Sequence, residues 1–263
     1  QLACSYLYIN ELSKTVPNFI YTFADFQDSE KNTNIVTDFV EGMTLEEYIN
    51  SNHFNLSILI DIFLSLCLAL YKAQQQCGFL HMDLYPWNII ISRKKEPVTL
   101  EYSTVIDHVK ISTNVVPIII DYGKSHFVHR GMHYYNTSPF HLCRIQDIIS
   151  IVFSSLYMLL EKHKLNDRDI RNVIHIMNFF SGSEYTNKTT FTNIGHVKSF
   201  LKKHKKFSKM LSEPKIGLEQ KSPMDFFKFL MDQKFTKNCK IQLEQTFPRS
   251  TNSYQWLDSL GTV

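Results

Sequence analysis

The stretch His81-Met82-Asp83-Leu84-Tyr85-Pro86-Trp87-Asn88-Ile89-Ile90-Ile91 is the most informative part of this chain. Asp83 and Asn88 stand in a short polar loop that leads into an apolar run typical of a buried strand. Farther on, Asp121-Tyr122-Gly123 follows the apolar run Pro117-Ile118-Ile119-Ile120, so a second acid is expected at a strand end. Two carboxylates and an amide that converge on one point would suit Mg²⁺-assisted phosphoryl transfer.

These two motifs resemble the catalytic loop and the metal-binding turn of the protein kinase superfamily. The resemblance covers roughly residues 2–160. It implies an α+β, protein kinase-like fold that is mostly the helical C-terminal lobe with the last strands of the N-terminal lobe. It further implies Asp83 as catalytic base and Asn88 and Asp121 as Mg²⁺ ligands. Asp147 resembles the aspartate that starts the central buried helix of a kinase and holds the backbone of the catalytic loop.

A nucleotide site is implied farther upstream, where residues 37–42 (Thr-Asp-Phe-Val-Glu-Gly) are similar to the hinge between the two kinase lobes. The resemblance implies a gatekeeper side chain, backbone hydrogen bonds to adenine, a ribose contact and two apolar walls. Thr37 would be the gatekeeper, and the backbone of Asp38 and Val40 would bind adenine. Thr44 would contact the ribose, and Ile90 and Ile120 would form the two apolar walls. ATP and Mg²⁺ are therefore the expected cofactors.

The resemblance also divides the chain. We expect residues 1–40 to be a remnant of the kinase small lobe and hinge, and residues 41–263 to be the large lobe with a β-hairpin insertion around 92–117. No G-x-G-x-x-G loop and no V-A-I-K lysine precede residue 17, so we expect an N-terminally truncated or a degenerate kinase.

Local patterns predict the individual elements. A hairpin is expected from two strand-like runs, and a buried helix ended by Gly78 from a long apolar run. Within the expected insertion, Lys94, Lys95 and Glu96 are interpreted as an exposed tip. The expected strands are 19–23, 34–40, 98–102 and 108–112, and the expected helices are 2–12, 45–49 (capped by Thr44), 56–76, 148–160, 170–180, 198–211 and 223–233.

The chain departs from the family pattern within the catalytic loop itself. Met82 replaces the usual arginine, Tyr85 stands where serine/threonine kinases usually carry a lysine, and Trp87 is atypical. The segment after Gly123 lacks an A-P-E motif. These traits are similar to those of divergent kinases such as the haspin-like group, or kinase-like proteins of large DNA viruses.

The composition limits which binding partners and which cellular compartment we expect. The net charge is +3 with a pI near 8.5, which is too mild to predict nucleic-acid binding. The cysteines are odd in number, scattered and without a CxxC pair, which favours a reducing intracellular compartment, cytoplasmic or nuclear, including that of a host cell if the protein is viral. No signal peptide and no membrane span are expected.

Three functions follow from these patterns. The first is a serine/threonine protein kinase that transfers the γ-phosphate of Mg-ATP to a protein hydroxyl. The alternatives are a pseudokinase that acts as a scaffold or binding module, and a small-molecule kinase of the choline or aminoglycoside type. Presence of all three site residues favours catalysis, and the hinge followed promptly by a buried helix favours a protein substrate. Whether this chain transfers phosphate alone is left open.

Overall fold

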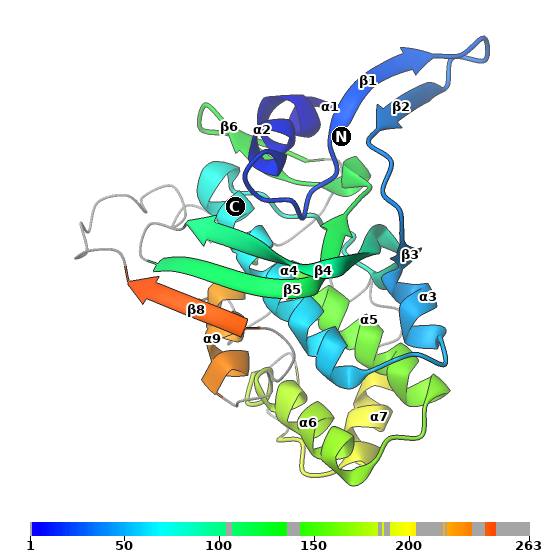
Figure 1. Ribbon diagram of the computed structural model, residues 1–263, viewed down its shortest axis with the longest axis vertical. Helices are drawn as coiled ribbons and strands as arrows, with labels where there is room; N and C mark the ends of the chain where they lie inside the picture. The colour runs from blue at the N-terminus through cyan, green and yellow to red at the C-terminus, as the bar shows by residue number, and fades with distance from the viewer. Residues whose placement is uncertain are drawn as a thin grey trace.

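The computed structural model describes residues 2–103, 107–135, 143–183, 186, 190–203, 218, 220–232 and 240–245. It is an α+β structure in which a sheet crosses the middle of the molecule above a layer of helices (Figure 1). The described helices are α1 (Leu2–Cys4), the π turn η1 (Ser5–Ile9), α2 (Asn10–Ser13), α3 (Leu45–Asn50), α4 (Leu56–Cys77), the 3-10 turns η2 (Pro86–Asn88) and η3 (Tyr122–Lys124), α5 (Gln146–Lys162), α6 (Asp167–Asn178), α7 (Ile194–Lys203) and α9 (Pro223–Asp232). The described strands are β1 (Thr22–Gln27), β2 (Thr33–Thr37), β3 (Met43–Thr44), β4 (Ile89–Ser103), β5 (Asp107–Ile119), β6 (Phe127–His129), β7 (Met132–Tyr134) and β8 (Lys240–Gln245).

The central helix α4 forms where the long apolar run predicted it. The Asn55 side chain caps its first turn by accepting a hydrogen bond from the Ser57 amide at 2.8 Å. Gly78 ends it in the left-handed region, at φ 59°, where a residue without Cβ is favoured. The helix packs against α9 and β5.

By length and composition, α4 is the one helix in the described residues that could cross a membrane, which the sequence-based expectation did not foresee. In this structure 78% of its most apolar stretch is buried. Its apolar side chains therefore form part of the hydrophobic core of the molecule.

The main sheet has the order β3-β4-β5-β8. Its long β4–β5 pair is antiparallel, with Ile89 opposite Ile119 at one end and Ser103 opposite His108 at the other. Side chains alternate between the two faces, so Ile89, Ile91 and Ile119 are buried in the core while Ile90 and Ile118 are only half-buried on the other face.

The strands expected at residues 98–102 and 108–112 are present, but the expected tip at Lys94, Lys95 and Glu96 was wrong. These three residues are exposed within β4, in the irregularity of pairing between Arg93 and Val98. The strand continues beyond them because its pairing with β5 resumes at Val98. Residues 104–106, which join the two strands, lie outside the described part of the chain.

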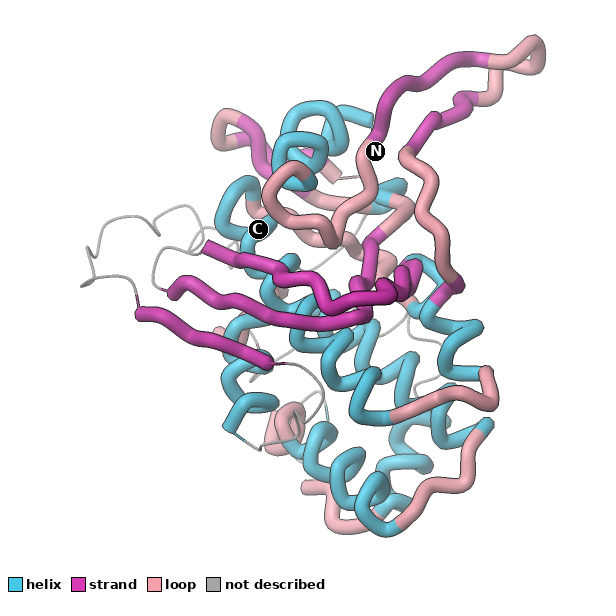
Figure 2. Tube along the Cα trace, viewed as in Figure 1, coloured by secondary structure: helices cyan, strands magenta, loops and turns pink. Residues whose placement is uncertain are grey.

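The β1–β2 hairpin is formed and projects from the body of the molecule (Figures 1 and 2). Its strands begin and end at other residues than the sequence predicted. Residues 19–21 precede β1 because they are held by β5 instead: the Ile20 amide donates to the Ile119 carbonyl at 3.1 Å, and Phe19 bridges Ile119 in parallel. Phe23 and Phe39 are exposed.

The C-terminal helices complete the core below the sheet. α5, α6 and α9 occur close to their predicted bounds, and Phe179, Phe180 and Phe226 pack among them. The predicted helix at 198–211 is described only as far as Lys203, as part of α7, and its remainder lies outside the described residues. The four cysteines in the described part are buried free thiols.

Candidate active site

The loop that carries Asp83 and Asn88 is held in place by Asp147, a fully buried carboxylate in the first turn of α5. Its two oxygens accept the backbone amides of His81 at 2.7 Å and Met82 at 3.0 Å. Met82 has a φ of 66°, a conformation that side chains other than glycine rarely adopt. The pair of charge-assisted hydrogen bonds stabilises this strained turn, and the turn directs the chain to Asp83.

Asp83 and Asn88 are held to each other through the backbone of the loop. The Asn88 side-chain nitrogen donates to the Asp83 carbonyl at 2.8 Å, and the Tyr85 amide donates to the same carbonyl at 2.9 Å. Because its nitrogen is directed into the loop, the Asn88 side-chain oxygen is the atom that can ligate a cation. The Asp83 side chain is 19% exposed, so its carboxylate is accessible from solvent.

The turn at Asp121 is equally constrained. Asp121 lies in the left-handed region at φ 59°, and its Oδ1 accepts the Gly123 amide at 3.1 Å. Tyr122, which stands in place of the phenylalanine typical of kinases, is buried and donates to the carbonyls of Ile119 at 2.9 Å and Ile20 at 3.2 Å. Burial raises the pKa of Tyr122 well above its usual range, so its hydroxyl remains a hydrogen-bond donor.

Three contacts bring the loop and the turn together. The Ile120 amide donates to the Asn88 carbonyl at 3.1 Å, and the His81 ring nitrogen Nε2 lies 2.9 Å from the Ile120 carbonyl. Lys124 Nζ lies 3.0 Å from Asp83 Oδ2. The structure therefore places Asp83, Asn88 and Asp121 on two adjoining turns.

Burial dominates the electrostatics around the loop. It raises the pKa of Asp147, and the neighbouring His81 and the two amides that donate to Asp147 act in the opposite direction. Burial, and then the nearby Asp83 charge, raises the pKa of Tyr85. Burial lowers the pKa of His126 to about 4, and this ring joins β6 to the end of α4 through the Gly78 carbonyl at 3.0 Å.

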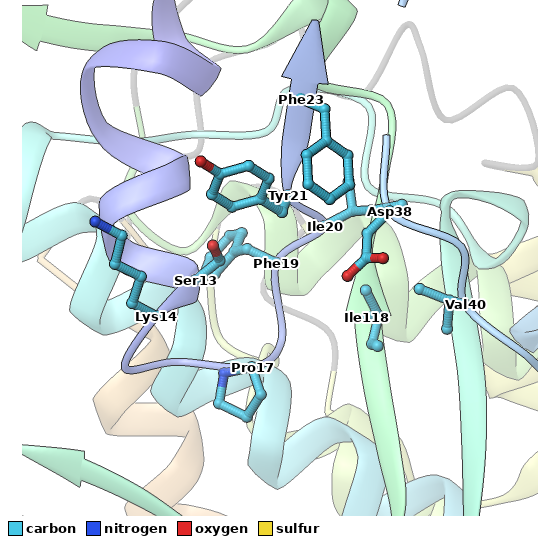
Figure 3. Close-up of a pocket in the computed structure, with 10 residues that line it drawn as sticks. All are labelled: Ser13, Lys14, Pro17, Phe19, Ile20, Tyr21, Phe23, Asp38, Val40 and Ile118. Carbon is cyan, nitrogen blue, oxygen red and sulfur yellow. The ribbon is translucent and has the colours of Figure 1, made fainter. Parts of the chain in front are cut away.

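A cavity of about 410 Å³ lies between the N-terminal helix, the residues before β1, the hinge and the end of β5 (Figure 3). Asp38, Val40 and Ile118 line one side of it, with Ser13 and Lys14 on the helix opposite. The complete lining is Ser13, Lys14, Pro17, Phe19, Ile20, Tyr21, Phe23, Asp38, Val40 and Ile118.

The six residues expected at the nucleotide are not all gathered there. Asp38 and Val40 line the cavity, whereas Thr37 is exposed at the end of β2. Thr44 caps α3: its Oγ1 accepts the Glu47 amide at 3.1 Å, within a reciprocal capping box. Ile90 and Ile120 are half-buried and are not among the lining residues.

Sequence reasoning missed eight of the ten lining residues, Ile118 among them, and it missed Lys124. Ile118 lines the cavity and stands directly opposite Ile90 in the β4–β5 pair, so it shares the face of the sheet that Ile90 occupies. The period-2 alternation of a strand, applied to Ile118 and Ile120, could have identified it. The contact of Lys124 with Asp83 had no signal in the sequence beyond the proximity of Lys124 to Asp121.

Asn88 and Asp121 fit a hard cation, because both offer oxygen ligands. Within the described residues no group of three or more His, Cys, Asp or Glu side chains could hold a metal ion by itself. A Mg²⁺ site that shares its ligands with substrate phosphates needs only one or two protein carboxylates. The residues present thus fit a shared site rather than a closed one.

No family model matches the chain. Protein 179R of Invertebrate iridescent virus 6 is 31% identical over 256 residues, which cover 84% of this chain and 21% of that protein. A protein described as probable kinase 098L of Invertebrate iridescent virus 3 is 30% identical over 128 residues, covering 49% of this chain and 24% of that protein. The mouse serine/threonine-protein kinase Nek10 is 31% identical over 91 residues, covering 33% of this chain and 8% of that protein. The chain thus spans about a quarter or less of each of these relatives.

Among solved structures, the granulovirus kinase PK-1 of Cydia pomonella superposes with a TM-score of 0.41 at 15% identity, covering 90% of this chain and 76% of that one. The kinase domain of PF14_0431 gives 0.38 at 18% identity, covering 90% and 84%. Both TM-scores lie below 0.5.

The buried aspartate under the loop, the Asp83–Asn88 turn and the Asp121 turn together define a kinase-like protein. The chain diverges from the kinase pattern within the loop, and the proteins to which it is similar include proteins of invertebrate iridescent viruses.

Proposed function

We propose that the protein transfers the γ-phosphate of Mg-ATP to a serine or threonine hydroxyl of a protein substrate. The observation that carries the proposal is the junction at Ile120, whose amide and carbonyl contact Asn88 and His81. This junction joins the turn of Asp121 to the loop of Asp83. Phosphoryl transfer depends mainly on positioning and charge neutralisation, and a fixed junction of this kind supplies positioning.

In the proposed reaction, the acceptor hydroxyl oxygen bonds to the γ-phosphorus while the bond from that phosphorus to the β–γ bridging oxygen breaks. Asp83 orients the hydroxyl and accepts its proton, and ADP leaves. Bound Mg²⁺ would neutralise charge on the phosphates, with Asn88 Oδ1 and the Asp121 carboxylate as its protein ligands. Asp147 takes no part in the chemistry and fixes the position of Asp83 through the loop amides.

The nucleotide is proposed to approach from the hinge side. Asp38 and Val40 contribute to the lining of the 410 Å³ cavity together with Ile118, which offers an apolar wall. Apolar walls with a few backbone hydrogen-bonding groups are typical of small-molecule sites. The roles of Thr37, Thr44, Ile90 and Ile120 stay predictions.

The test is phosphate transfer from γ-labelled ATP to casein in the presence of Mg²⁺, for the wild type and for Asp83→Asn. Asp167→Asn, which removes an exposed carboxylate from the first turn of α6, is the matched control. We expect kcat to fall about 10²- to 10⁴-fold in Asp83→Asn and to stay unchanged in the control. Labelled serine or threonine in the hydrolysed casein would support the acceptor class.

Other outcomes separate the alternatives. Mg²⁺-dependent ATP binding without any transfer would contradict the proposal and favour a scaffold. Transfer to choline or an aminoglycoside, but not to casein, would favour a small-molecule kinase. Equal turnover in the wild type and Asp83→Asn would exclude Asp83 as the base.

A further inference from the structure

Lys124 is a cation that the turn of Asp121 delivers to the proposed base. It is the last residue of η3, and its Nζ lies 3.0 Å from Asp83 Oδ2. Its side chain is 53% exposed and that of Asp83 is 19% exposed. An ion pair this exposed contributes little to the free energy of folding. We therefore consider its position beside the proposed base.

The turn that carries Lys124 is held at several points. The Ser125 amide and hydroxyl both donate to the Tyr122 carbonyl, at 3.1 Å and 2.7 Å, and the Tyr122 hydroxyl is anchored on Ile119 and Ile20. These contacts fix the position of Lys124 relative to Asp121. A ligand that binds at Asp121 lies next to this ammonium group.

The loop itself offers no cation for the reaction. Residues 83–88 read Asp-Leu-Tyr-Pro-Trp-Asn and contain no basic side chain. The loop carries two aromatic rings instead: Tyr85 and Trp87 stack with ring centroids 4.7 Å apart and an angle of 17° between their planes. The anionic base and the transferred phosphoryl group both carry negative charge and repel each other. A positive charge close to both would reduce this repulsion.

We propose that Lys124 is a catalytic residue that bridges Asp83 and the phosphoryl group during transfer. The proposal rests on the proposed function. Its ammonium group donates to the γ-phosphate oxygens and reduces the repulsion between the phosphate and the Asp83 carboxylate. The proton still passes from the acceptor hydroxyl to Asp83, and the broken bond is still the one between the γ-phosphorus and the bridging oxygen.

The experiment compares Lys124→Met and Lys124→Arg with the wild type in Mg-ATP transfer to casein. Lys198→Met is the matched control, because Lys198 forms a similar exposed ion pair with Glu161 at 3.2 Å, on α7 and α5. We expect Lys124→Met to lower kcat about 10²-fold with little change in the KM for casein, and Lys124→Arg to retain activity within about tenfold. The melting temperature should be unchanged in all three, since the side chain is exposed.

A second variant tests the position of the charge. In Tyr85→Lys/Lys124→Met the cation returns from the turn to the loop, and we expect at least a tenfold recovery of kcat over Lys124→Met. If this double variant does not fold, the comparison of Lys124→Met with Lys124→Arg tests whether a positive charge is needed at position 124.

The outcomes distinguish this inference from the function on which it rests. A Lys124→Met variant that transfers phosphate within threefold of the wild type, or faster, overturns the role of Lys124. If Asp83→Asn is inactive in the same assay, the proposed function stands. A wild type that transfers nothing overturns both.

Discussion

At the scale of single residues, Asp147 has the clearest structural role. It is fully buried, and each of its two oxygens accepts a backbone amide of the loop. These bonds help to hold Met82 at φ 66°. Asp147 is a positioning residue, since its effect on any reaction passes through Asp83.

We therefore expect Asp147→Asn to destabilise the fold by about 2 kcal/mol, because an amide offers one acceptor oxygen where the loop presents two donors. The turn at Met82 should relax, so kcat for phosphate transfer should fall by more than the loss of folded protein explains. Urea denaturation and transfer to casein measure the two effects. Asp167→Asn again serves as control, since it also removes a first-turn carboxylate but from an exposed site. Full activity in Asp147→Asn would contradict the positioning role.

The positions of site residues could be predicted from sequence where the residues lie close together along the chain. Asp83 and Asn88 were predictable because one turn fixes their spacing. The environment of Thr37 was not, because it depends on whether other elements cover the β1–β2 hairpin. Only the first residue of β1 is buried, and Thr37 is exposed.

At the scale of elements, the approach of the hinge to β4 rests on Gly42. A Cβ built on Gly42 would lie 2.4 Å from the Ile91 carbonyl oxygen and 3.0 Å from a methyl of Ile90. The nearest obstacle is backbone, which cannot rotate away. The close contact keeps β3 paired with β4 at Met43 and Thr44, directly after the hinge.

Gly42→Ala should consequently destabilise the protein by about 1–3 kcal/mol, since the added methyl forces the hinge away from β4. If the hinge binds the nucleotide, the affinity for ATP should fall as well. Chemical denaturation and ATP titration by calorimetry measure these changes. Gly195→Ala is the control: its nearest neighbour is the Asn193 side-chain oxygen at 3.2 Å, in the first turn of α7, and we expect a change within about 1 kcal/mol. Equal effects at the two glycines would contradict the close-approach argument.

Helices and strands could be predicted where the local sequence pattern alone determines them. α4 and α5 follow from long apolar runs, and Gly78 marks the end of α4. Short strands were missed because tertiary contacts make them: β6 and β7 pair where His126 is bonded to the Gly78 carbonyl and lies 2.9 Å from His133. β8 carries a weak period-2 signal in Lys-Ile-Gln-Leu-Glu-Gln that was overlooked.

At the scale of the whole molecule, one sheet joins the candidate site to the far end of the chain. β8 pairs with the outer half of β5, from Asp107 to Ser112, while the inner half of β5 leads to Asp121. In Figure 1, β8 covers the edge of the sheet opposite β3. An exposed strand edge is a template for pairing with another chain, and β8 occupies that position along the outer half of β5.

Deleting residues 240–263 should uncover that edge, whereas deleting residues 246–263 keeps β8 and is the matched control. In the first variant we expect the amides of residues 107–112 to exchange with deuterium at least about tenfold faster, because their strand loses its partner on one side. We also expect concentration-dependent self-association on size-exclusion chromatography. Peptide-level hydrogen exchange gives an internal reference in the Ile89–Ile91 segment, which pairs with β3 and the inner half of β5 and should keep its protection. If the two truncated proteins exchange alike throughout β5, then β8 does not stabilise the sheet.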